Sequence, residues 1–251
     1  MEQRQNISAL QRYLRRLTAG LAFVLPFVLQ VTAQDIHFTQ FFSTPLILNP
    51  AQTGYYEGNY RIGFNFKAQW PWAIQGKVYN YHSETPYVDF SFGEKKIRVG
   101  WMGIGFNFLN DEAGDGFLTY RRFGLSYASH QALDKDHRYM LSAGVAVNYI
   151  IRSVDFSKFY FNDQWVEDVG FVTSIDPREP VQKDNFSMAD LSAGIKFEGH
   201  VHNQVKIDGG LSMLHLNRPR HSFLGTDERL GLRYQANLGI EYNINERITI
   251  S

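Results

Sequence analysis

The sequence predicts an all-β fold, an antiparallel transmembrane β-barrel of the bacterial outer membrane. Three observations favour it: an N-terminal export signal, recurrent alternation of apolar and polar residues, and connections that alternate between long and short. Alternation with a period of two puts successive side chains on opposite faces of a strand. After residue 33, no stretch is long and apolar enough to predict a membrane-spanning helix.

The N-terminus has the parts of a secretory signal peptide. Arginines precede an apolar stretch at 17–31, and small residues for cleavage follow at Val31-Thr32-Ala33. A membrane anchor is the alternative, but the stretch is shorter than the roughly 20 residues of a spanning helix and contains Pro26. We therefore expect residues 1–33 to be a signal peptide, and the mature chain to begin at Gln34.

The composition excludes several classes of function. The chain has no cysteine, which removes disulfides, thiol nucleophiles and thiolate metal sites. Its formal net charge of +0 gives no overall attraction to nucleic acid, so no nucleic-acid partner is expected. Aromatic residues make up 15% of the chain, which suits strands and the aromatic girdles of outer-membrane barrels.

Alternation recurs along the chain after residue 59. One face of 60–70 reads Tyr-Ile-Phe-Phe-Ala-Trp, while the other reads Arg-Gly-Asn-Lys-Gln. A strand is also predicted around 87–92, where Pro86 would remove a ladder hydrogen bond if pairing extended backward. Strands of this kind are predicted at 60–70, 87–92, 102–108, 122–127, 139–151, 190–198, 205–213 and 232–242.

Connection lengths indicate which end of the barrel faces outward, because outer-membrane barrels have short periplasmic turns and longer external loops. External connections are predicted at 71–77, 109–116, 155–188 and 217–230. Periplasmic turns are predicted at 93–97, 130–138, 200–204 and 243–247. This orientation makes 59–251 the barrel and leaves 34–58 on the periplasmic side or folded into the lumen.

A soluble β-sandwich or lipocalin-like barrel also alternates, but its apolar face points inward. The membrane barrel is favoured because the strands are long. In addition, the expected inner face mixes glycine with charges such as Arg122, Arg152 and Glu241.

An irregular phrase runs from Phe38 to Gly54, with aromatic-X-Gln-aromatic, Pro-Leu and Asn-Pro-Ala groups, and Tyr60-Arg61 and Gln69-Trp70 follow it. In order and spacing these groups resemble the opening of the PorP/SprF family of outer-membrane proteins. The resemblance implies a non-enzymatic barrel, without a cofactor, in the type IX secretion and gliding-motility machinery. The partners it implies are periplasmic lipoproteins or motor-complex proteins and secreted surface adhesins, beside outer-membrane lipid.

Partner binding is expected at this phrase, although an ordered lumen plug is an equal alternative. The candidate residues are Phe38, Gln40, Phe41, Pro45, Asn49, Pro50 and Gly54. The aromatic-rich loop at 155–188 is a second candidate surface, or else an ordered lid. A porin or transport channel is the main rival function, and a barrel enzyme the second. Family members are usually longer, so we expect further strands beyond Ser251 to close the barrel.

No catalytic or metal site is predicted. His200 and His202 are the only close histidine pair, and they fall in an expected turn without a nearby carboxylate cluster. The acidic, glycine-containing stretch at 111–116 lacks the spacing of a calcium loop and is better explained as an external turn.

Overall fold

A computed structural model describes residues 41–69, 81–93, 100–114, 118–176, 184–202, 204–223, 225–245 and 248–250. These residues belong to the second of two compact units, His37–Ser251. The expected signal peptide, Trp70 and the connection at 71–77 lie outside the described residues. Among the described helices, none has the length and apolar character needed to cross a membrane.

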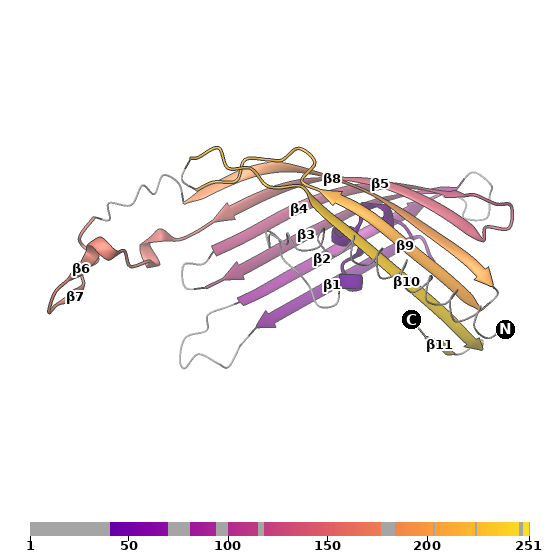
Figure 1. Cartoon of the computed structure of the whole chain (residues 1–251), viewed down its shortest axis with the longest axis horizontal. Coiled ribbons are helices and arrows are strands. Elements are labelled where there is room, and N and C mark those ends of the chain that lie inside the picture. Colours follow the sequence, from indigo (N-terminus) through magenta and orange to yellow (C-terminus); the bar gives the residue numbers. More distant parts are fainter. Residues whose placement is uncertain are drawn as a thin grey trace, which may run out of the picture. The chain divides into compact units, whose positions relative to one another are not determined.

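One antiparallel sheet dominates the unit, and each strand pairs with the next in the order β1-β2-β3-β4-β5-β8-β9-β10-β11. Figure 1 shows this sheet curling, with the helical turns α2 (Pro45–Leu48) and η3 (Pro50–Gln52) lying against it. Its strands are β1 (Tyr60–Gln69), β2 (Tyr81–Phe92), β3 (Trp101–Ala113), β4 (Leu118–Ala132), β5 (Tyr139–Ser153), β8 (Asn185–His202), β9 (Val205–Leu214), β10 (Arg233–Asn245) and β11 (Ile248–Ile250). The predicted antiparallel all-β fold is confirmed.

The remaining short elements precede β1 or interrupt the connection between β5 and β8. They are η2 (Phe41–Ser43), η4 (Phe156–Lys158), η5 (Asn162–Gln164) and the small hairpin of β6 (Trp165–Val166) and β7 (Gly170–Phe171).

Several strands are longer than the sequence predicted, so parts of the expected connections were wrong. Residues 109–113 belong to β3, residues 130–132 to β4 and residues 185–188 to β8. His200 and His202 are also in β8, where the register with β9 shifts between them, and not in a turn. The extra residues alternate less clearly because polar side chains occupy the strand ends, yet backbone pairing continues through them.

Strand β2 begins at Tyr81 and so extends backward through Pro86, beyond the predicted start at Tyr87. Pro86 pairs with Phe64 of β1. On the other side, the pairing of β2 with β3 skips Thr85 and Pro86 and resumes in the same register at Glu84. Proline lacks only its own N–H, so the sheet loses hydrogen bonds locally without ending the strand.

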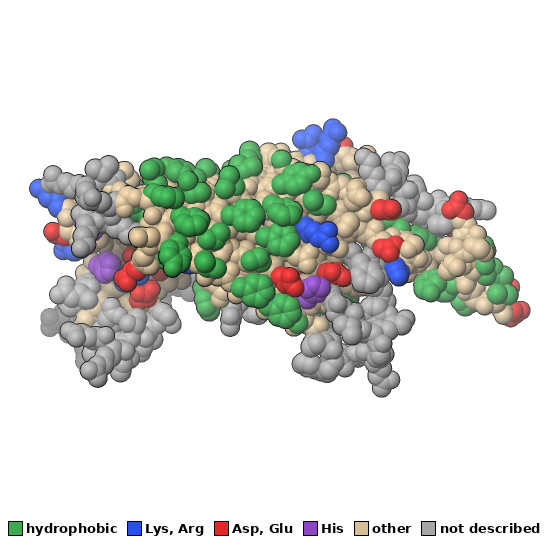
Figure 2. Space-filling model, turned by 180° about the vertical axis from the view of Figure 1, so that it is seen from behind, with side chains coloured by type: hydrophobic (Ala, Val, Ile, Leu, Met, Phe, Trp, Pro, Cys, Tyr) green, Lys and Arg blue, Asp and Glu red, His purple; other side chains and the backbone are tan. Residues whose placement is uncertain are grey.

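The two faces of the sheet decide between the membrane and soluble alternatives. Apolar side chains of the alternating strands point outward: Ile62 is 74% exposed and Leu238 75%. Polar side chains point inward, and Asn107 and Asn148 are fully buried. Figure 2 shows the hydrophobic side chains gathered in a band across one face, with charged side chains toward its ends. This arrangement inverts that of a soluble sandwich and is the pattern of a barrel sheet in lipid.

Candidate functional site

The segment from Thr44 to Tyr56, called the inner segment below, folds against the inward face of the sheet. Proline begins both of its helical turns, where the missing N–H costs nothing and the fixed φ suits a helix start. The Asn49 side chain caps the second turn by accepting a hydrogen bond from the Ala51 N–H at 2.9 Å. Leu46 and Ala51 are at most 1% exposed, so the segment is packed as tightly as a protein core.

Asn49 also ties the segment to two strands that lie far away in sequence. Its Nδ2 donates to the Ile195 carbonyl of β8 at 3.0 Å and to the Leu211 carbonyl of β9 at 3.4 Å. The Ser212 hydroxyl returns a hydrogen bond to the Leu48 carbonyl at 2.8 Å. Together these bonds hold the first half of the inner segment on β8 and β9.

Glycines in the sheet make this close approach possible. A Cβ at Gly194 would lie 2.0 Å from Asn49 Oδ1, and one at Gly144 would lie 2.5 Å from the Pro50 carbonyl oxygen. At Gly103 a Cβ would lie 2.2 Å from the Thr53 carbonyl oxygen. The inner segment therefore occupies space that any other residue at these positions would fill.

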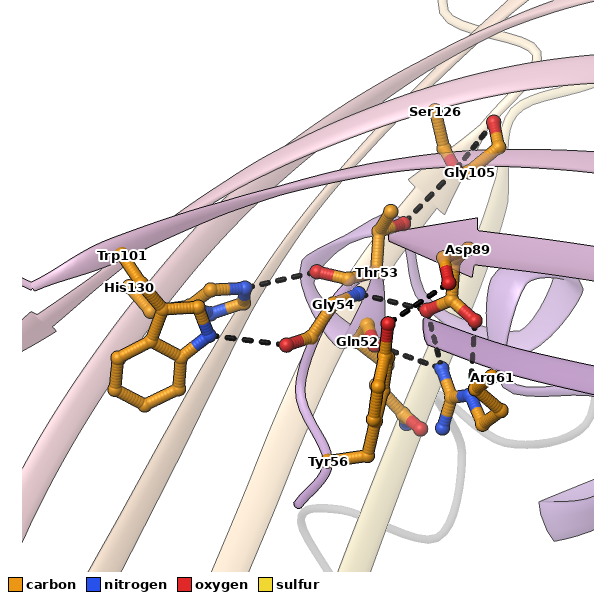
Figure 3. A network of polar contacts seen from close by, with 10 residues as sticks. All are labelled: Gln52, Thr53, Gly54, Tyr56, Arg61, Asp89, Trp101, Gly105, Ser126 and His130. Atoms are coloured by element: carbon orange, nitrogen blue, oxygen red, sulfur yellow. Dashed lines mark hydrogen bonds and ion pairs between the residues drawn. The ribbon is translucent and has the colours of Figure 1, made fainter. Parts of the chain in front are cut away.

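A polar network joins the second half of the segment to β2, β3 and β4 (Figure 3). The Thr53 hydroxyl donates to Ser126 Oγ at 2.9 Å, and His130 Nε2 lies 2.8 Å from the Thr53 carbonyl oxygen. Since a carbonyl only accepts, Nε2 carries a proton, and Nδ1 lies 2.8 Å from Ser142 Oγ. Trp101 Nε1 donates to the Gly54 carbonyl at 2.9 Å.

Asp89 is the buried charge at the centre of this network. Its side chain is 0% exposed and forms an ion pair with Arg61. Asp89 Oδ1 accepts a hydrogen bond from Arg61 Nε at 3.0 Å, and Asp89 Oδ2 accepts one from Arg61 Nη2 at 2.7 Å. It also accepts the Gly54 N–H at 2.7 Å, where the positive φ of 73° favours glycine. Arg61 reaches the Gln52 carbonyl at 3.2 Å as well, so one ion pair closes the segment onto β1 and β2.

Tyr56 provides a pH-dependent signal from this region. Its hydroxyl donates to the Asp89 carbonyl at 2.8 Å, and burial together with the Asp89 charge raises the pKa of Tyr56 to about 12. A raised tyrosine pKa means that folding favours the protonated form. Its contribution to stability is complete below the ordinary tyrosine pKa of about 10 and is lost as pH rises toward 12.

We therefore expect the difference in 295 nm absorbance between the wild type and Tyr56→Phe to titrate with a midpoint near pH 12. Tyr60→Phe, which removes an exposed phenol from β1, is the matched control and should keep the component near pH 12 that Tyr56→Phe removes. A Tyr56 midpoint at the ordinary tyrosine pKa of about 10 would contradict the contact with Asp89.

A second series of hydrogen-bonded polar side chains crosses the inward face at β4, β5 and β8. Arg122 Nε donates to Asn148 Oδ1 at 2.9 Å, and Asn148 Nδ2 donates to Asp190 Oδ2 at 3.0 Å. His215 Nδ1 lies 2.8 Å from Asp190 Oδ1. These bonds link the buried Arg122 cation to the buried Asp190 anion across β4, β5 and β8. Alternation marked these positions as inward-facing, but it could not indicate which of them meet.

The structure distributes the predicted binding residues unevenly. Pro45, Asn49, Pro50 and Gly54 come together on the inward face and are buried there. Phe41 begins η2, whereas Phe38 and Gln40 lie outside the described residues. Sequence reasoning missed the sheet residues that hold the segment: Asp89, Trp101, Ser126, His130, Gly103, Gly144 and Gly194. Among the described residues, no group of three or more histidine, aspartate or glutamate side chains forms a potential metal site.

A separate surface lies on the connection between β5 and β8. In the β6–β7 hairpin, Trp165 is 56% exposed and Val169 is 71% exposed. The ring centroids of Trp165 and Phe171 lie 4.9 Å apart. Gln164 is buried beneath the hairpin, donating to the Ile175 carbonyl and accepting the Phe161 N–H. Asp163, Glu167 and Asp168 are exposed and lie next to these aromatic residues in the sequence. The hairpin is thus a locally ordered apolar surface with an acidic rim.

Comparison with known proteins identifies the family. The family model of the type IX secretion system membrane protein PorP/SprF matches residues 30–251. No curated protein and no solved structure matches the chain.

Proposed function

Because this chain belongs to the PorP/SprF family of type IX secretion system membrane proteins, we propose that it is a non-enzymatic outer-membrane component of that machinery, which docks periplasmic partners or anchors secreted adhesins. The observation that carries the proposal is the family match over residues 30–251. The outward apolar face and inward polar face of the sheet support a location in the outer membrane.

The inner segment supports docking in a specific way. The part from Thr44 to Gly54 is fixed to six strands of the sheet, β1, β2, β3, β4, β8 and β9, by hydrogen bonds. Phe42, two residues before Thr44, is 67% exposed. Residues that precede a rigid anchor are held in place at little further entropic cost, which favours binding. In this proposal Pro45, Asn49, Pro50 and Gly54 position the binding surface, and Phe38, Gln40, Phe41 and Phe42 contribute to it.

The hairpin surface suits adhesin anchoring. It lies on the connection between β5 and β8, on the side where longer loops are expected to face the exterior. Exposed aromatic clusters with a polar rim are typical of protein-binding surfaces. The acidic rim favours an apolar partner surface that carries basic residues at its edge.

The test is a pull-down of the tagged chain from detergent-solubilised envelopes of a bacterium that uses type IX secretion. The wild type should recover periplasmic lipoproteins and motor-complex proteins. We expect Trp165→Ala with Phe171→Ala to keep these partners but to lose most of any adhesin, since truncating aromatic anchors commonly costs about 2 kcal/mol or more of binding energy. Leu216→Ala, an exposed apolar residue in the connection between β9 and β10, is the matched control.

Phe42→Ala should reduce recovery of the periplasmic partners and leave adhesin recovery unchanged. Recovery of the barrel alone, with robust conductance in planar bilayers, would replace this proposal with the porin alternative. Hydrolysis or acyl transfer by the purified protein would show instead that it is an enzyme.

A further inference from the structure

The outward face of the sheet contains a groove that the secretion role does not explain. It encloses about 790 Å³ and crosses β4, β5, β8, β9 and β10. We call it the outer groove, and its lining includes Tyr127, Ala143, Ala193, Leu211, Met213 and Tyr234. The volume is in the usual range of small-molecule sites, which is about 300–1,000 Å³.

Strand register creates the groove by placing small residues beside large ones. Ser129 is opposite Ala143 on β5, and Ala193 lies between Val145 of β5 and Met213 of β9. Side chains directly opposite one another on neighbouring strands are the closest neighbours on a sheet face. The small residues therefore form a floor, and their large neighbours form the walls.

We propose that the outer groove holds one acyl chain of a membrane glycerophospholipid as a specific site. The groove is continuous with the outward apolar face, which this fold places in hydrocarbon. Its lining contains no charged residue, so an ionic or strongly polar occupant would lose its hydration without gaining partners. The phenol-bearing Tyr127 and Tyr234 lie at opposite sides of the groove, on β4 and β10, where their hydroxyls can meet polar lipid atoms.

A smooth apolar face exchanges its lipids freely, whereas a groove with a floor of small residues contacts a chain on three sides. The additional contacts come from side chains that the sheet already holds in place, so the ordering cost falls on the lipid alone. Retention of one lipid through purification is the expected consequence.

The test is native mass spectrometry of the purified full chain, first stripped of lipid in detergent and then titrated with 1-palmitoyl-2-oleoyl-phosphatidylethanolamine. We expect the wild type to bind one lipid well before any others. Ala193→Phe fills the floor of the groove and should weaken this first binding step on the order of tenfold or more. The matched control is Ala189→Phe, the same change on the same face of β8, opposite Tyr149 and outside the groove.

Heat-modifiable migration in gels would show that each variant is folded, and Ala193→Leu with Ala189→Leu repeats the comparison with a smaller side chain. Equal lipid retention by the Ala193 and Ala189 variants would overturn the proposal and leave ordinary annular lipid. A drop in oligomeric mass in Ala193→Phe alone would overturn it in favour of a second copy of this chain as the occupant.

Discussion

Alanine at Gly144 is expected to force the inner segment away from the sheet. The new Cβ would lie 2.5 Å from the Pro50 carbonyl carbon and oxygen and 2.6 Å from the Ala51 nitrogen. These are backbone atoms of a turn that is itself buried, so they cannot move aside as a flexible side chain would. Overpacking of this kind typically costs about 1–3 kcal/mol, and relief requires the segment to detach.

The expected result has two readouts. The Gly144→Ala protein should unfold at lower urea concentration, and chymotrypsin should cleave it after Tyr55 and Tyr56, which the packed segment protects in the wild type. Gly209→Ala is the matched control, because its Cβ would meet nothing closer than 3.6 Å. Equal protease resistance of the two variants would show that the segment is not held against β5 as the structure has it.

Removing the Asp89 carboxylate should have the second large effect. Asp89→Ala leaves the Gly54 N–H without its acceptor and the Arg61 guanidinium without its carboxylate, with the Gln52 carbonyl still within reach, in a place where Asp89 itself is 0% exposed. Breaking a buried ion pair by removing one partner commonly costs about 3–5 kcal/mol, and the partial exposure of Arg61 puts this case at the lower end. The residues from Gln52 to Arg61 should loosen together.

Urea unfolding gives the stability change, and amide hydrogen exchange at Gly54 gives the local change. Asp136→Ala breaks the 3.6 Å ion pair with Arg138 between two well-exposed side chains, so it should change stability by less than about 0.5 kcal/mol. If Asp89→Ala were as mild as this control, Arg61 and Gly54 would have to find other acceptors, and Asp89 would not anchor the segment.

Both predictions concern how the sheet and the inner segment depend on each other. A curled open sheet with a polar inward face has few apolar contacts of its own on that side. The inner segment supplies them through Leu46 and Ala51, and it satisfies polar groups of β2, β4, β8 and β9. The inner segment is thereby fixed on the inward face of the sheet.

Alternation was sufficient to predict the eight long strands and which residues alternate between the two faces, but not the short hairpin of β6 and β7. This information is local, because side chains alternate between the two faces of a strand, so a lipid-facing surface requires an apolar residue at every second position of the sequence. Strand ends were less predictable. The mostly polar residues from Asn110 to Ala113 and those around His200 resemble a turn in composition, and only pairing with a neighbouring strand shows that they continue the sheet.

The phrase between Phe38 and Gly54 was recognisable in the sequence, but what it contacts was not. Asn49 meets a carbonyl 146 residues away, and Thr53 meets His130 77 residues away. No local pattern encodes such pairs, since each depends on the register and curl of strands that fold around the segment. The sequence specified that this phrase is irregular and distinctive. The tertiary structure decided that Pro45, Asn49, Pro50 and Gly54 face inward, because glycines on three strands leave room there for a backbone.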